Sequence, residues 1–187
     1  RGLEAEAYQQ SGYFTVDQAR KHGVSRQLLN HHLRTGRFDR VGRGLYRVRG
    51  FPSSQYDDIR ERWMAVGMDK AVVSHESALA LLDLSDSIPD KVHLLVPRQH
   101  RGLRRPSSVV IHTHPDDEKL STVWRDAMPV TAPARTLVDI ADELQPEQAA
   151  MAAREALRLG LLTRRQLEQE AARRGKTRVL KTLLPDR

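Results

Sequence analysis

Two histidines and two aspartates stand close together in the second half of the chain, between His112 and Asp117. On a strand, His112 and His114 would share a face and could approach one metal ion. The proline and acidic residues beside them also suit an ordinary exposed loop. His75-Glu76 lacks the second histidine that a zinc-protease motif places four residues on. We therefore expect no metal, no other cofactor and no catalytic residue, and a nuclease that uses His112–Asp117 is the alternative of another class.

A second set of polar residues fits the recognition of nucleic acid. In a helix that begins after Ser25, Leu28, Leu29 and Leu33 would form a buried stripe at helical spacing. The opposite face would present side chains that can reach base edges or phosphates in a DNA major groove. These side chains are Arg26, Gln27, Asn30, His31 and Arg34.

A basic hairpin follows this helix. Strands that include Phe38–Val41 and Leu45–Val48 are indicated by apolar alternation, and the glycines between them permit a tight turn. Arg40, Arg43 and Arg47 lie at its tip and outward positions, where they suit phosphate contact or insertion into a minor groove. We interpret the hairpin as a wing, the alternative being a small helical subdomain with incidental arginines.

The helices that must position these residues are indicated by capping residues at their starts and by helix-breaking residues at their ends. Residues 2–10 predict a short helix, which Ser11-Gly12 ends. Thr15 and Gln18 form a capping box for a helix over residues 16–22, and Ser25 can cap the third helix. The order helix, turn, helix and basic hairpin predicts a winged helix-turn-helix over residues 1–50 that binds double-stranded DNA.

The distribution of charge agrees with this prediction. The chain has 187 residues and a net charge of +7, and residues 1–50 hold ten Lys or Arg against four Asp or Glu. Residues 51–187 therefore carry a net charge of only +1, although a merely solvated basic surface is an alternative. The absence of cysteine excludes disulfides and thiolate sites. No apolar run approaches the roughly 18 residues of a membrane span and no signal peptide is evident, so we expect a cytoplasmic protein.

The remainder of the chain predicts a second, mixed domain over residues 51–187. Helices are expected over residues 55–68, from Ser74 to Leu82, around Leu137, after Pro146 and after Thr163, and strands over residues 91–96 and 109–112. The basic stretch from Arg98 to Arg105 is expected to be a solvated hairpin loop, with a second contact to nucleic acid or to an acidic partner as the alternative. Asp139 is expected to pair with Arg135 or to cap a turn. The fold class is α+β.

Several motifs of the chain resemble those of one family. Gly12-Tyr13-Phe14-Thr15, Gly23-Val24-Ser25-Arg26 and Arg40-Val41-Gly42-Arg43-Gly44-Leu45-Tyr46 are similar to the N-terminal domain of AbiEi-family antitoxins of bacterial type IV toxin-antitoxin systems. Met128–Asp139 resembles the internal signature of that family. Some longer relatives carry an additional nuclease-like domain, and we expect none here.

The resemblance implies an antitoxin that counteracts a nucleotidyltransferase-like toxin and represses its own operon by binding promoter DNA. The expected partners are double-stranded operator DNA and a cognate toxin. Direct contact with the toxin and self-association on DNA are left open. The alternative is a plain winged-helix transcriptional regulator with a C-terminal dimerisation or ligand-sensing domain.

Overall fold

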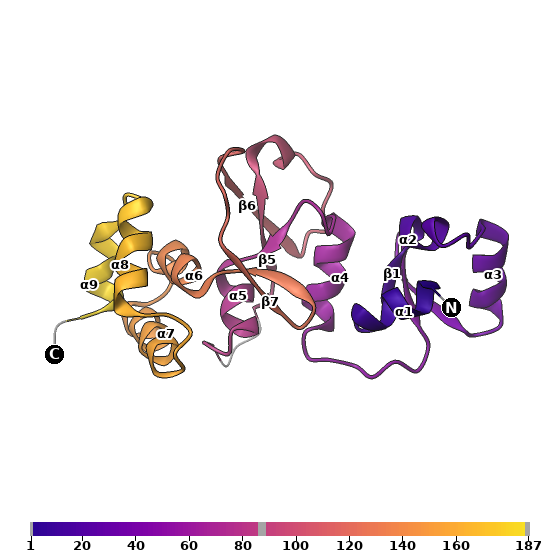
Figure 1. Cartoon of the computed structure of the whole chain (residues 1–187), viewed down its shortest axis with the longest axis horizontal. Coiled ribbons are helices and arrows are strands. Elements are labelled where there is room, and N and C mark those ends of the chain that lie inside the picture. The colour runs from indigo at the N-terminus through magenta and orange to yellow at the C-terminus, as the bar shows by residue number, and fades with distance from the viewer. Residues whose placement is uncertain (1, 86–88, 186–187) are drawn as a thin grey trace. The chain divides into compact units, whose positions relative to one another are not determined.

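The computed structural model describes residues 2–85 and 89–185 (Figure 1). The chain forms two compact units, with the boundary between Asp69 and Lys70. The division expected from the sequence, after residue 50, lies inside the first of these units. In the described residues no helix is long and apolar enough to cross a membrane.

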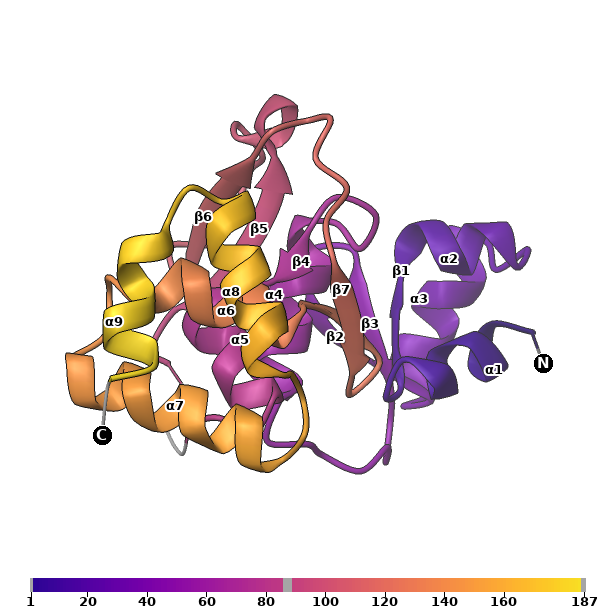
Figure 2. The ribbon, with the colours of Figure 1, turned by 60° about the vertical axis from the view of Figure 1, so that its left-hand side comes forward.

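The first unit combines helices with a small antiparallel sheet. Its helices are α1 Gly2–Gln9, α2 Val16–Lys21, α3 Arg26–Arg34 and α4 Asp57–Val66. Its strands are β1 Tyr13–Thr15, β2 Phe38–Gly42 and β3 Leu45–Val48, in the order β1-β3-β2 (Figure 2). The expected helix-turn-helix and hairpin are therefore present, while β1, which pairs Phe14 with Tyr46, was not predicted as a strand.

Aromatic packing holds this unit together. The ring of Phe14 lies 4.8 Å from that of Phe38 and 5.6 Å from that of Tyr46, measured between centroids. Leu3, Ala19 and other apolar residues of the helices bury their side chains in the same cluster. Burial of this kind stabilises by about 25 cal/mol for each Å² of apolar surface removed from water, so the cluster fixes the helices on the sheet.

The predicted helix caps are present in the first unit. Thr15 and Gln18 form the capping box of α2, because the Gln18 backbone N–H donates to the Thr15 hydroxyl and the Gln18 carboxamide accepts from the Thr15 N–H. The Ser25 hydroxyl accepts from the Leu28 backbone N–H at the start of α3. These bonds satisfy backbone donors that the first turn of a helix leaves unpaired.

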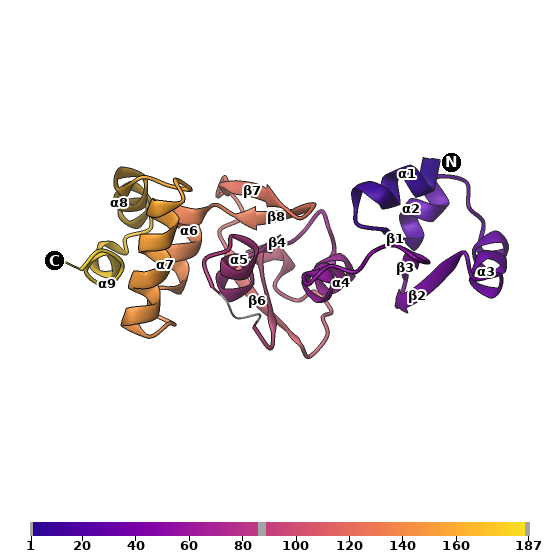
Figure 3. The same cartoon turned by 90° about the horizontal axis from the view of Figure 1, so that it is seen from below.

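The second unit contains a mixed sheet of five strands with helices (Figure 3). The strands are β4 Val72–Val73, β5 Val92–Pro97, β6 Val109–His114, β7 Thr122–Arg125 and β8 Met128–Thr131, in the order β6-β5-β4-β8-β7. The helices are α5 His75–Leu81, α6 Pro133–Ile140, α7 Pro146–Arg158, α8 Arg164–Arg173 and α9 Leu180–Leu183, and two 3-10 turns cover Arg98–His100 and Thr177–Val179. The predicted α+β class is confirmed.

The prediction that Arg98–Arg105 forms a hairpin loop is wrong. Strands β5 and β6 are parallel, with Leu94 opposite Ile111, so the basic stretch belongs to a crossover that begins with the 3-10 turn Arg98–His100. Two apolar runs separated by a polar loop look alike in a sequence whether they pair parallel or antiparallel. The direction of pairing is decided by the sheet, in which β5 also pairs antiparallel with β4.

Candidate nucleic-acid interface

Helix α3 presents a polar face to solvent. Arg26, Gln27, Asn30, His31 and Arg34 are all exposed. Leu29 is only 3% exposed and packs in the core of the first unit, with Leu33 half-buried against it. One apolar edge therefore anchors α3 and leaves the opposite face free, as expected for a recognition helix.

Leu28 corrects one expectation about this helix. We expected it in the buried stripe, but it is 41% exposed. Adjacent residues of a helix point about 100° apart, so the small core that receives Leu29 cannot also receive Leu28. Leu28 therefore lies beside the polar residues, where an apolar side chain can contact the methyl group of thymine.

The wing is formed by β2, β3 and the turn between them. Gly44 has φ +72°, a backbone conformation that glycine adopts without steric cost, and its carbonyl accepts from the Val16 backbone N–H at 2.8 Å. This bond ties the turn to the start of α2. Arg40 and Arg43 are exposed on the wing, and the Arg40 Nε donates to the Gly42 carbonyl at 3.3 Å.

Arg47, unlike Arg40 and Arg43, is half-buried and contacts residues outside the wing. Its Nη2 is 3.0 Å from Asp57 Oδ2 and donates to the Pro52 carbonyl at 2.8 Å, and its guanidinium lies over the Tyr13 ring. Its side chain is only 17% exposed. The sequence predicts that Arg47 contacts DNA, and this stays a prediction, but in the structure its Nη2 is engaged by groups of its own unit.

Several other basic residues of the first unit are paired with acids. Arg37 Nε lies 2.8 Å from Glu4, and Arg49 Nη2 lies 2.6 Å from Asp39. The hydrogen bond from Arg49 lowers the pKa of Asp39 below its usual value, so the carboxylate stays charged. By contrast, no intramolecular hydrogen bond or ion pair engages the side chains of Arg26, Arg34 and Arg43 within the described part of the chain.

The observed unit boundary also changes the charge balance. Residues 1–69 hold twelve Lys or Arg and eight Asp or Glu, a net charge of +4, which leaves +3 for residues 70–187. Residues 51–69 add four acidic residues and two arginines, and two of the acids, Asp57 and Asp58, pair with arginines of the same unit. The free positive charge of the first unit therefore depends on particular side chains on α3 and the wing rather than on a large net excess.

The second unit separates the histidines that the sequence placed together. The buried His114 donates its Nδ1 proton to the Pro115 carbonyl at 2.8 Å and lies 3.8 Å from Glu118. His112 instead stacks on His75, whose ring centroid is 3.4 Å away. The alternative in which His112 and His114 approach one metal ion therefore has no geometric support, and the contact of His112 with His75 was not predicted because His75 stands far away in the sequence.

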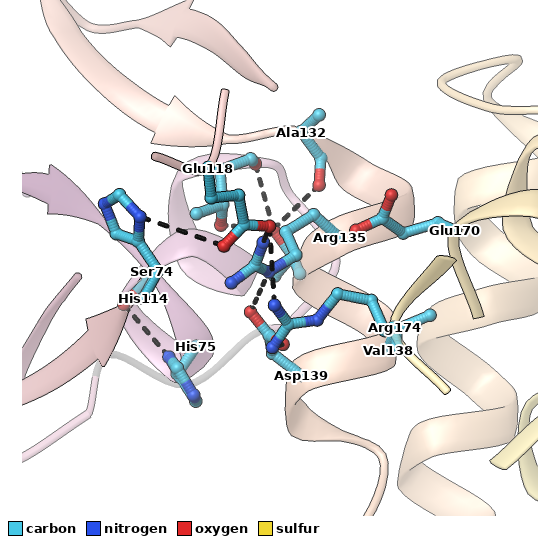
Figure 4. A network of polar contacts seen from close by, with 12 residues as sticks. Ser74, His75, His114, Glu118, Ala132, Arg135, Val138, Asp139, Glu170 and Arg174 are labelled. Carbon is cyan, nitrogen blue, oxygen red and sulfur yellow. Dashed lines mark hydrogen bonds and ion pairs between the residues drawn. The ribbon is translucent and has the colours of Figure 1, made fainter. Parts of the chain in front are cut away.

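A buried ionic network connects α6 with α8 (Figure 4). Arg135 is 1% exposed, pairs with Asp139 one helical turn away, and donates from Nη1 to Glu118 at 2.6 Å. Arg174 on the segment after α8 donates to Asp139 at 3.0 Å. The expected pairing of Arg135 with Asp139 is confirmed, and the network gives this part of Met128–Asp139 a structural role.

The first unit is a winged helix-turn-helix, defined by α2, the turn before α3, α3 itself and the β2–β3 hairpin. Residues 3–49 match a family model described as "Transcriptional regulator, AbiEi antitoxin", which confirms the resemblance over this segment. The match does not include Met128–Asp139. The resemblance of that segment to the internal signature of the family therefore stays a prediction.

One solved structure resembles the chain over nearly its whole length. The RV2827C protein from Mycobacterium tuberculosis matches with a TM-score of 0.54 and 16% sequence identity, over 98% of this chain and 75% of that protein. At this identity the likeness concerns the fold. No curated protein matches the sequence.

Proposed function

We propose that this chain is an antitoxin that represses its own operon by binding promoter DNA through α3 and the wing. The observation that carries the proposal is the exposed polar face of α3 together with Arg26, Arg34 and Arg43, whose side chains pair with no acid among the residues that the structure describes. Arg26, Gln27, Asn30, His31 and Arg34 of α3 enter the major groove. Arg40 and Arg43 contact the phosphates beside it.

The match to a family of antitoxin transcriptional regulators supports both halves of this proposal. The partner of the antitoxin half is a nucleotidyltransferase-like toxin, as the resemblance implies. The second unit counteracts that toxin, through a surface that includes the exposed arginines of the β5–β6 crossover. These are Arg98, Arg101, Arg104 and Arg105. The proposed role involves binding and no catalytic step.

Replacing Arg26, Arg40 and Arg43 with alanine in the full chain tests the assignment of DNA binding. The variant is expected to lose its preference for the promoter DNA of its own operon in electrophoretic mobility shift assays, with an unchanged circular dichroism spectrum. A matched control replaces Arg154, Arg158 and Arg165 with alanine. These three residues are exposed on the second unit, and their replacement removes the same number of positive charges. If both variants lose affinity equally, net charge rather than this surface governs DNA binding.

The same variant tests whether repression and neutralisation are separable. Cells that carry an inducible cognate toxin are expected to survive with the Arg26, Arg40 and Arg43 variant at normal protein levels. Replacing Arg98, Arg101, Arg104 and Arg105 is expected to reduce survival while promoter binding persists. Loss of protection in the first variant would assign the antitoxin activity to the winged unit and contradict the proposed division.

A further inference from the structure

Three histidines from distant parts of the sequence meet on one face of the second unit's sheet. His75 begins α5, His93 lies on β5 and His112 lies on β6. His93 and His112 share a face because His93 lies opposite Val110, two residues before His112. The His93 Nδ1 is 3.1 Å from the His112 Nε2, and the His75 ring stacks on the His112 ring at 3.4 Å.

A carboxylate completes the group. Glu143 follows α6, and its Oε1 is 3.8 Å from the His75 Nε2. One ligand atom from each of His75, His112 and Glu143 lies within 4.8 Å of the others. Ligand atoms held about 2.0–2.1 Å from a tetrahedral zinc ion are themselves about 3.4 Å apart, and the 3.8 Å between His75 and Glu143 is close to this value. The planes of the two stacked imidazoles are 12° from parallel, so both rings would have to rotate for their lone pairs to meet at one ion.

The His75 ring has a polar neighbour at each of its two nitrogens. The ring of His75 is oriented by the Ser74 hydroxyl, 3.0 Å from its Nδ1, which leaves Nε2 directed toward Glu143.

The backbone also points to a ligand. His75 has φ +50°, in the left-handed region that a side chain disfavours, and such strain is often retained where a residue binds something. The nearby Arg135 is already neutralised by Glu118 and Asp139.

We propose that His75, His112 and Glu143 bind one divalent transition-metal ion, for which Zn²⁺ is the best fit. Two imidazoles and one carboxylate, with a fourth position left to water, are typical of a tetrahedral zinc site. Bound metal would link α5, β6 and the segment after α6. The proposal goes beyond repression and neutralisation, because it gives the second unit a ligand of its own.

Metal binding is measured directly on the full chain without a histidine tag, after treatment with EDTA and removal of the chelator. Titration with zinc chloride in a calorimeter is expected to show one site per chain, and the melting temperature should rise with zinc concentration. Titration with Co²⁺ is expected to give the intense visible bands of a tetrahedral complex. Absence of saturable binding of both ions overturns the proposal.

Variants assign the ligands. His112→Gln is expected to weaken zinc binding by on the order of 100-fold or more, since losing even an outer-shell partner costs 10–100-fold. Glu143→Gln is expected to weaken it about 10-fold, and because Glu143 is exposed this variant should fold even if His112→Gln does not. His100→Gln, in the same unit but outside the group, is the matched control. Equal affinity in all three variants overturns the assignment. Because neither DNA nor toxin takes part, failure here leaves the proposed function standing.

Discussion

Arg47 on β3 and Asp57 on α4 form an ion pair at 3.0 Å, and the Arg47 guanidinium lies 4.6 Å from the centroid of the Tyr13 ring. The Tyr13 hydroxyl in turn donates to Glu61 on α4 at 2.9 Å. Strands β1 and β3 are therefore joined to α4 by contacts that are partly screened from water. These contacts place α4 in the first unit and give Arg47 a structural role.

Arg47→Ala is expected to destabilise the first unit by about 2 kcal/mol, because it leaves the half-buried Asp57 without a cationic partner and removes a cation from the face of Tyr13. Urea denaturation measures the change. Arg47→Ala combined with Asp57→Ala should cost less than the two single changes added together. If Arg47→Ala left stability intact and weakened DNA binding as much as Arg43→Ala, the prediction that Arg47 contacts DNA would be correct.

The salt dependence of promoter binding should report the phosphate contacts of the wing. Each lost contact lowers the slope of log affinity against log salt by about 0.9. Replacing Arg40 and Arg43 together is therefore expected to reduce the slope by about 1.8, measured by fluorescence anisotropy over a series of salt concentrations. Replacing Arg154 and Arg165 should leave it unchanged. An unaltered slope in the wing variant would show that neither arginine contacts a phosphate.

Substitutions on α3 should act on sequence discrimination. Gln27→Ala and Asn30→Ala are each expected to reduce the preference for operator over random DNA by about 1–3 kcal/mol, because a direct base contact is lost. Arg43→Ala should weaken binding to both DNAs alike. The measurement is competition between labelled operator and unlabelled random duplex. A uniform loss from all three variants would contradict the assignment of α3 as the recognition helix.

Glu118 should make the stability of the second unit sensitive to acid. Burial raises the pKa of its carboxyl, but hydrogen bonds and charge from Arg173, Arg135 and Arg174 outweigh burial, so the folded-state pKa is lowered from 4.5. The folded state therefore binds the proton less readily than the unfolded state, and this stabilisation is complete above about pH 5 and is lost as the pH falls through the folded-state pKa.

Glu118→Gln is expected to cost about 2 kcal/mol at pH 7, because Arg135 stays buried with Asp139 as its remaining acidic partner in the network. The variant should also lose less stability than the wild type between pH 5 and pH 3. Denaturation curves at each pH give both quantities. A variant as stable as the wild type at pH 7, with the same dependence on pH, would show that the network does not stabilise this unit.

Much of the first unit is determined by the sequence itself, because its signals act over a few residues. The hydroxyls of Thr15 and Ser25 begin α2 and α3 by bonding backbone groups within the next turn. Gly44 allows the tight turn of the wing. The interval between Leu29 and Leu33 leaves the polar residues of α3 on the opposite face. The family match covers residues 3–49, the segment that contains these local signals.

The tertiary structure alone decided which distant groups meet. Strands β4, β7 and β8 are too short to show a period, and the parallel pairing of β5 with β6 has no local signal. Arg43 and Arg47 look alike in the sequence, yet only Arg47 finds an acid on α4. His75 and His112 stack although thirty-six other residues stand between them in the chain. Contacts of this kind depend on how the sheet orders its strands, and that order follows from burying the whole core at once rather than from any single segment.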